Sequence, residues 1–373
     1  MTTESSGSAT LLHLRHLTTV RQDITALATG KRLVRVAGMN VLIIGGTGLI
    51  STGIVKHLQK RGADISMFNR GKRENTLDGP VGVFTGDRND PAVLEQCVAG
   101  GRKWDVVIDM ICFTPEQATG AIRTFAGKCE HFIFCSTVCT YGTKVPPGVV
   151  IDETFPQEPI SGYGKNKVAC ENLFTAAHGR GDFACTIIRP SHTYGEGSPL
   201  IDQLEPDAIA WDRIARGQPV LCAGDGIGLW NSTHRDDVGK LFAFAALNSK
   251  TYGQSYNATT ERVFTWRDYY REAADALGTT AQVLPMPAEW IIGHDPKRFG
   301  LLREITQFHG PYTSAKARRD VPEFDVEIDF RSGAQRTLAD VKRRGAWRDS
   351  SADAMYQGMI DKAVALGVRP LDL

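Results

Sequence analysis

Apolar and polar positions follow two alternating patterns in the first half of the chain. Short apolar runs, typical of fully buried strands, alternate with segments whose apolar residues recur every three or four positions, as in amphipathic helices. The expected strands cover residues 40–44, 63–68, 81–84, 105–109, 131–135 and 184–188. The expected helices cover residues 49–61, 91–98, 115–125 and a segment that includes Tyr163 and ends near Ala177. This alternation predicts an α/β fold with a doubly wound parallel (Rossmann-type) sheet.

The pattern loosens after Gly195. It predicts helices near residues 205–216, 236–248, 266–277 and 352–366, and strands near 219–222 and 254–258. We expect a smaller mixed C-terminal lobe over the carboxyl edge of the sheet, where such folds bind ligands. The expected division is an N-terminal extension over 1–38, a Rossmann domain over 39–195, and a mainly substrate-binding lobe over 196–373, some of whose elements return to the sheet domain.

Residues 1–38 are rich in Ser and Thr, are basic, and contain no continuous apolar stretch. We expect a poorly ordered extension without a catalytic role; a targeting presequence, or a true start at Met39, are the alternatives. A secretory signal is disfavoured. The sequence contains no run of about 18 apolar residues, so it predicts no membrane span. We therefore expect a cytoplasmic protein.

The net charge and the cysteine pattern bear on binding partners, disulfide bonds and metal sites. A net charge of +1 gives no reason to expect nucleic acid or an anionic membrane. The eight cysteines include no Cys-x-x-Cys pair. Reduced, buried thiols are expected, and neither a disulfide framework nor a metal site.

A glycine-rich turn follows the first expected strand. Glycine permits a tight bend there and lets the N–H groups of the next helix approach a pyrophosphate. The last glycine of the usual spacing is replaced by Ser51, which is small enough for close helix–strand packing. A tight connection without a ligand is the alternative. The expected cofactor-binding residues of this turn are Gly45, Gly46, Thr47, Gly48, Leu49 and Ile50.

Residues after the second and third strands bear on the choice of cofactor. Turns that prefer NAD place an acidic residue after the second strand, whereas this chain has Asn69. Arg70, with Lys72 or Arg73, is suited to pair with the 2′-phosphate of NADP, although solvated surface charge is the alternative. We expect NADP or NAD, with a preference for NADP. The expected contacts at this end are Asn69, Arg70, Asp87, whose carboxylate suits the adenine amino group, and Arg88.

Tyr163 and Lys167 stand four residues apart in a helical segment. That spacing places both side chains on one helix face. A phenol has an ordinary pKa of about 10, and a neighbouring ammonium lowers it by favouring the phenolate. The pair therefore predicts a proton-transfer site for a carbonyl or carbinol substrate.

With these motifs the chain resembles the extended short-chain dehydrogenase/reductases, of the NAD-dependent epimerase/dehydratase type, over about residues 40–340. The resemblance rests on the order and spacing of Gly45-Gly-Thr-Gly48, Asp87, Ser136-Thr137, Tyr141-Gly142, Tyr163, Lys167, Arg189-Pro190, Tyr194-Gly195 and Asp236-Asp237.

The resemblance implies roles for individual residues. Tyr163 would be the general acid/base, and Lys167 would lower its pKa and hold the nicotinamide ribose. Thr137 would orient the substrate oxygen. Pro190 and Ser191 would pass near the nicotinamide, whereas the adjacent His192 is given no role.

Three departures from the family pattern narrow the function. Val138-Cys139 replaces the Asp-Glu of the sugar dehydratases, which disfavours dehydration. Cys139 matches an acid/base cysteine of one epimerase, with a structural thiol as the alternative. Trp230 stands where sugar-nucleotide enzymes have a diphosphate-binding arginine, which an indole cannot replace, although it can stack on a sugar. This last change, and the segment Asp109-Met-Ile-Cys112, resemble a branch that includes chloroplast stem-loop RNA-binding proteins.

The leading hypothesis is an NAD(P)-dependent enzyme acting by hydride transfer at a carbinol or carbonyl carbon of a sugar-like substrate, with epimerisation favoured. The alternative is a net NADP-dependent dehydrogenase or reductase of a non-nucleotide substrate. A non-catalytic NADP- or RNA-binding protein on the same fold is a further alternative, disfavoured because Thr137, Tyr163 and Lys167 are all present. The resemblance also implies a possible homodimer.

Overall fold

The computed structural model describes residues 38–72, 81–206 and 209–373. The expectation for the N-terminal extension over 1–38 therefore lies almost wholly outside the described residues. Arg73, one candidate for the 2′-phosphate, also lies outside them.

The described residues contain a seven-stranded sheet in the order β11-β6-β5-β4-β1-β2-β3. Every neighbouring pair in it is parallel, with Asn40 beside Asp64 on one side of β1 and Val41 beside Val106 on the other. The predicted Rossmann-type sheet is confirmed. Its strands are β1 (Asn40–Ile44), β2 (Asp64–Asn69), β3 (Gly82–Thr85), β4 (Trp104–Asp109), β5 (Cys129–Cys135), β6 (Ala184–Pro190) and β11 (Gln254–Ala258).

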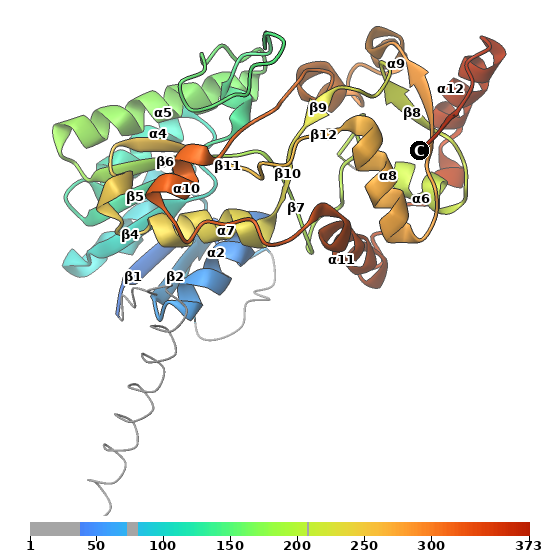
Figure 1. The fold of residues 1–373 in the computed structure, drawn as a ribbon. Coiled ribbons are helices and arrows are strands. Elements are labelled where there is room, and N and C mark those ends of the chain that lie inside the picture. Colours follow the sequence, from blue (N-terminus) through green and yellow to red (C-terminus); the bar gives the residue numbers. More distant parts are fainter. Residues whose placement is uncertain (1–37, 73–80, 207–208) are drawn as a thin grey trace, which may run out of the picture.

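Alternate residues of β1 face two separate cores, which explains its continuous apolar sequence. Val41 and Ile43 belong to the core beneath α2 (Leu49–Lys60) and α7 (Arg235–Ala245). Leu42 and Ile44 belong to the core beneath α4 (Pro115–Phe125) and α5 (Gly162–Arg180). Helices thus cover both faces of the sheet (Figure 1). The short helices α3 (Pro91–Glu95) and α10 (Ala315–Asp320) add to these two layers.

A second lobe lies beside the sheet domain (Figure 1). It contains a three-stranded sheet of β8 (Val220–Ala223), β13 (Gln282–Met286) and β14 (Leu371–Asp372). Its helices are α6 (Ala210–Ala215), α8 (Trp266–Leu277), α9 (Ala288–His294), α11 (Phe330–Arg343) and α12 (Ala354–Ala365). Two short strand pairs lie between the lobes: β7 (His192–Tyr194) with β10 (Ser232–His234), and β9 (Leu229–Trp230) with β12 (Phe264–Thr265).

The second lobe contains elements that the apolar pattern did not predict. Helix α11 buries Phe330, Leu338 and Val341 at helical spacing, but charged and small residues separate them, and this helix was not among those expected. Strand β13 contains Pro285, which disfavours a strand in sequence. In the first half, the helix expected over 91–98 ends at Glu95 and continues as a 3₁₀ turn in which Gly100 adopts a positive φ of 68°.

Helices α2 and α7 approach at two glycines. A Cβ on Gly53 would lie 2.3 Å from the Arg235 carbonyl oxygen, and one on Gly239 would lie 2.3 Å from the Gly53 carbonyl carbon. Both obstacles are backbone atoms, which cannot rotate away. This contact brings α7, from the second half of the sequence, against the first helix of the sheet domain.

Replacing Gly239 with Ala should therefore lower the free energy of unfolding by about 1–3 kcal/mol, because the new methyl group overpacks a backbone contact. Gly120→Ala in α4 is the matched control, since nothing lies within 4 Å of its added Cβ. It should be neutral or slightly stabilising. Urea unfolding followed by circular dichroism measures both variants, and equal midpoints would contradict the close-packing account.

Candidate active site

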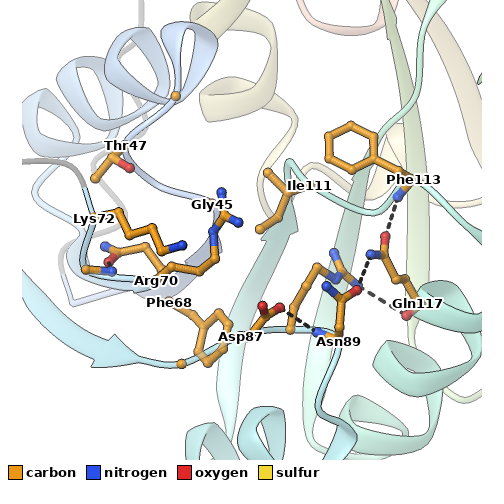
Figure 2. Close-up of a pocket in the computed structure, with 15 residues that line it drawn as sticks. Gly45, Thr47, Phe68, Arg70, Lys72, Asp87, Asn89, Ile111, Phe113 and Gln117 are labelled. Carbon is orange, nitrogen blue, oxygen red and sulfur yellow. Dashed lines mark hydrogen bonds between the residues drawn. The ribbon is translucent and has the colours of Figure 1, made fainter.

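Two adjoining cavities follow the carboxyl edge of the parallel sheet. The first has a volume of about 340 Å³ and lies between the ends of β1, β2 and β3. The second, of about 310 Å³, extends toward the ends of β5 and β6. Both are lined by Gly45, Gly48, Ile111 and Phe113, so they form one continuous groove. Figure 2 shows the side chains around the first cavity.

The glycine turn is held by close contacts on one side and is open on the other. Gly45 has a positive φ of 89°, and an added Cβ would meet Ile111 at 2.6 Å. A Cβ on Gly46 would meet the Met67 sulfur at 2.3 Å, so Gly46 packs against β2, whereas Gly45, Thr47 and Gly48 line the first cavity. The buried Ser51 hydroxyl donates to the Gly45 carbonyl at 2.8 Å. Its small size thus serves the close packing that the sequence suggested.

The N-terminus of α2 suits a pyrophosphate. No side chain caps it, and its first turn contains no acidic residue. Its free N–H groups and its dipole favour an anion at this position. Leu49 and Ile50, in this first turn, line the second cavity. The residues present therefore fit a dinucleotide that crosses from one cavity to the other.

Basic residues line the outer end of the first cavity (Figure 2). Arg70 and Lys72 line it, and neither pairs with a carboxylate among the described residues. The Asn69 side chain accepts a hydrogen bond from the Gly71 N–H at 2.8 Å, and Asp87 accepts one from the Asn89 N–H at 3.0 Å. The predicted residues of this end thus lie together around one cavity.

Arg88 also lines this cavity, but its guanidinium is directed elsewhere. It forms hydrogen bonds of 2.6 and 2.9 Å with both oxygens of the buried Asp109 carboxylate and donates to the Gln117 carbonyl at 3.1 Å. This buried ion pair joins the ends of β3 and β4. Its arrangement favours a structural role over the predicted cofactor contact.

Thr137, Tyr163 and Lys167 all line the second cavity. Ser161 caps the helix that carries the pair, accepting from the Gly164 N–H at 3.0 Å. The Thr137 side chain lies close enough to the Tyr163 hydroxyl to influence its pKa. The Lys167 side chain, only 1% exposed, donates from Nζ to the Cys135 carbonyl at 2.7 Å. The fold therefore brings the three predicted catalytic residues to one wall.

The pKa of Tyr163 does not move in the direction the helix spacing suggested. Although 42% of the residue is exposed, burial around the hydroxyl raises its pKa, as do the nearby Cys135 and Cys139, while the neighbouring Thr137 side chain opposes the change. Lys167 does not offset this. Its Nζ is held by a backbone carbonyl and lies 5.7 Å from the centre of the Tyr163 ring.

Pro190, Ser191 and Thr193 also line the second cavity. His192 faces away from it, with its ring 5.8 Å from that of Trp230 and Nδ1 hydrogen-bonded to the Ser232 hydroxyl at 2.7 Å. Pro190 and Ser191 thus line the same cavity as Tyr163, and their contact with a nicotinamide stays a prediction.

Cys139 and Trp230 line a third, smaller cavity of about 40 Å³ between the lobes. Burial raises the pKa of the Cys139 thiol. The uncharged thiol is therefore favoured, and an acid/base role for Cys139 stays a prediction. We refer to this cavity as the Trp230 pocket.

A buried network behind the catalytic residues was not anticipated. Arg189 forms hydrogen bonds of 2.9 and 2.6 Å with the Glu171 carboxylate, which also accepts from the Ser136 hydroxyl. Arg189 donates at 2.9 Å to the Tyr141 hydroxyl, which donates in turn to Asn257 at 2.7 Å. The network ties α5 to β5, β6 and β11. The motif residues Ser136, Tyr141 and Arg189 were the available signal, but their pairing needs the fold.

Phe113 was also missed by the sequence reasoning. It is 43% exposed, lines both large cavities, and lies 4.9 Å from Lys167 Nζ and 6.4 Å from the Tyr163 ring. Its backbone N–H donates at 2.7 Å to Gln117, which bonds to Asn89 (Figure 2). The sequence feature that could have indicated Phe113 is its position directly after the unusual segment Asp109-Met-Ile-Cys112 at the end of β4.

Comparison with known proteins agrees with this geometry. The model of the NAD dependent epimerase/dehydratase family matches residues 41–259, more than half of the chain. The chain belongs to this family. It is thus of the extended short-chain dehydrogenase/reductase type, as the motifs suggested.

Two related proteins match more than two thirds of this chain. A 2′-dehydrokanamycin reductase of Streptomyces kanamyceticus is 29% identical over 252 residues, covering 68% of this chain and 70% of that protein. The chloroplast stem-loop binding protein of 41 kDa b from Arabidopsis thaliana is 24% identical over 329 residues, covering 80% and 82%.

Among solved structures, the UDP-glucose 4-epimerase of Thermus thermophilus in complex with NAD matches with a TM-score of 0.65 and 21% identity, covering 82% of this chain and 99% of that one. At this identity the likeness supports the fold alone. In the described part of the chain, no helix has the length and apolar character to cross a membrane.

The partly buried His192 predicts a pH dependence of stability. Burial lowers its pKa from 6.5 to about 3. Between these values the unfolded chain binds a proton that the folded protein does not, so stability falls as pH decreases below 6.5 and this loss is absent above it. The His192→Asn variant should reduce the slope of unfolding free energy against pH by about 1 kcal/mol per unit between pH 6 and 4.5. Urea unfolding across this range tests it, and an unchanged slope would refute the assignment.

Proposed function

We propose that the protein is an NAD(P)-dependent oxidoreductase that interconverts a carbinol and a carbonyl on a sugar-like substrate without a nucleotide. The observation that carries the proposal is the position of Thr137, Tyr163 and Lys167 on the wall of a cavity continuous with the glycine-turn groove. Family membership supports an enzyme of this general class.

The proposed mechanism assigns each step to a residue of this wall. A bound nicotinamide dinucleotide supplies the hydride acceptor or donor. In the oxidative direction Tyr163 takes the proton of the substrate hydroxyl, and in the reductive direction its hydroxyl returns a proton to the carbonyl oxygen. Thr137, which lines the same cavity close to Tyr163, orients that substrate oxygen. Lys167 provides a fixed positive charge on the same wall.

Net redox chemistry on a non-nucleotide substrate is favoured over epimerisation of a sugar nucleotide. Trp230 is buried in an aromatic cluster, 4.9 Å from the Trp266 ring, and cannot bind a diphosphate as an arginine would. One of the two relatives that match most of the chain is a reductase. The sequence alone favoured epimerisation over net redox chemistry, and these points lead us to propose the opposite order.

Epimerisation remains the second candidate, because redox followed by its reversal uses the same three residues. The non-catalytic alternative receives some support from the likeness to the stem-loop binding protein. A cytoplasmic location and a homodimer stay predictions.

Replacing Tyr163 with Phe should reduce turnover roughly 10²–10⁴-fold, because the proton donor is lost. Turnover is measured as the change in NADPH absorbance with a panel of aldoses, cyclitols and their keto forms. NADP⁺ affinity, measured by calorimetry, should change little. Tyr252→Phe, which removes a hydroxyl bonded to Glu130 away from the cavities, is the control. Full activity of the Tyr163 variant would eliminate the catalytic assignment.

NADP is the proposed cofactor because Arg70 and Lys72 line the first cavity and pair with no carboxylate among the described residues. The Arg70→Ala variant should weaken NADPH binding roughly 10–100-fold, since it removes a charge-assisted hydrogen bond to phosphate. NADH binding should stay nearly constant. Arg123→Ala on the exposed side of α4 should alter neither. Tighter binding of NADH than of NADPH by the unaltered protein would overturn this choice.

A further inference from the structure

Trp230, which lines the Trp230 pocket, carries a buried hydrogen-bond donor without an acceptor among the described residues. Trp230 is 6% exposed, and its indole Nε1 has no partner in the described structure. A buried N–H without a partner is costly, and such groups normally bond to protein or water. The aromatic contacts with Trp266 and His192 hold the indole in place without satisfying this group.

A second donor lines the same pocket. The Tyr312 hydroxyl makes no hydrogen bond with a described residue, and burial raises its pKa, so it stays protonated. His309, on the exposed rim, accepts from the Leu229 N–H at Nδ1, which leaves Nε2 as an N–H donor in the neutral ring. The pocket therefore offers uncharged donors to an incoming oxygen.

The pocket adjoins the proposed catalytic wall. Cys139 lines the pocket, and its backbone N–H donates at 3.2 Å to the Thr137 hydroxyl. Its thiol lies close enough to influence the pKa of both Tyr163 and Tyr312. Trp230 belongs to β9, which pairs with β12, and in Figure 1 both strands lie between the two lobes.

Size and charge restrict what can enter. A water needs roughly 10–15 Å³ of such a volume, so a pocket of about 40 Å³ holds a group of about three heavy atoms, far fewer than a nucleoside. Among the described residues, no lysine or arginine lines it. Its only carboxylate, from Glu304, is paired with Arg303 at 2.6 Å.

We propose that the Trp230 pocket is a specificity subsite for a small, uncharged, oxygen-bearing substituent of the substrate, such as a hydroxymethyl group, which accepts a hydrogen bond from the Trp230 indole. Aromatic and aliphatic side chains, including Phe308, Ile305 and Ile160, surround the carbon atoms of this substituent. The inference rests on the proposed function, because it takes the ring that bears the substituent to lie in the second cavity beside Tyr163.

The test compares two probes that differ only in this group: methyl β-D-glucopyranoside, which has a hydroxymethyl group on its ring, and methyl β-D-xylopyranoside, which lacks it. The protein, with its six tryptophans labelled with ¹⁵N, is titrated with each probe in the presence of NADP⁺. Trp230→Phe identifies the Trp230 indole signal. We expect this signal to move with the glucoside and to stay in place with the xyloside. Equal movement with both probes, or none with either, would overturn the subsite.

A kinetic measurement separates failure of the subsite from failure of the proposed function. Trp230→Phe should lower kcat/KM for the glucoside roughly 3–10-fold, the usual effect of losing one neutral hydrogen bond, and leave NADP⁺ affinity unchanged. Trp290→Phe on α9 is the matched control, since Trp290 lies outside the pocket, against His294. Movement of the Trp230 signal without any turnover would preserve the subsite and refute the oxidoreductase. If both probes were turned over and Trp230→Phe left that turnover unaltered, the oxidoreductase would be preserved and the subsite refuted.

Discussion

Parallel pairing of the seven strands is the constraint on which the site depends. In a parallel sheet all carboxyl ends meet at one edge, so loops far apart in sequence surround one groove. The glycine turn follows β1, Arg70 follows β2 and Asp87 follows β3. Phe113 lies after β4 and Thr137 after β5. None of these residues needs to be near another in sequence, because the strand register places them together.

The sequence predicted the sheet domain in the first half of the chain well, because the patterns that indicate its strands, turns and helices are local. A fully apolar strand such as Asn40–Ile44, followed at once by glycines, leaves few alternatives to a buried strand and a tight turn. The spacing of Tyr163 and Lys167 on one helix also predicts that both reach one wall, which is where the structure has them.

Features that depend on distant contacts could not be predicted in the same way. Helix α11 has few large apolar residues among many charged ones, and Phe330 and Leu338 are buried by packing against other elements of the second lobe. The pKa of Tyr163 depends on burial and on Cys135 and Cys139, not on the lysine one turn away, because the Cys135 carbonyl holds that lysine. Arg88 resembles a cofactor contact in sequence, yet it is paired with Asp109 beneath the cavity.

The junction between the lobes bears on the proposed substrate. The resemblance implies a diphosphate-binding arginine where this chain has Trp230, and the cavity beside that indole is small and has no lysine or arginine among the described residues. A change from a cation to a buried aromatic residue alters which substrates can bind while Thr137, Tyr163 and Lys167 stay in place. The cofactor groove and the substrate junction can therefore diverge separately.

A crystal structure of the protein grown with NADP⁺ tests the central claim most directly. The account predicts the pyrophosphate at the N-terminus of α2, the 2′-phosphate beside Arg70, and the nicotinamide in the second cavity next to the Tyr163 hydroxyl. A nicotinamide directed away from Tyr163, or a dinucleotide bound outside the groove, would contradict it.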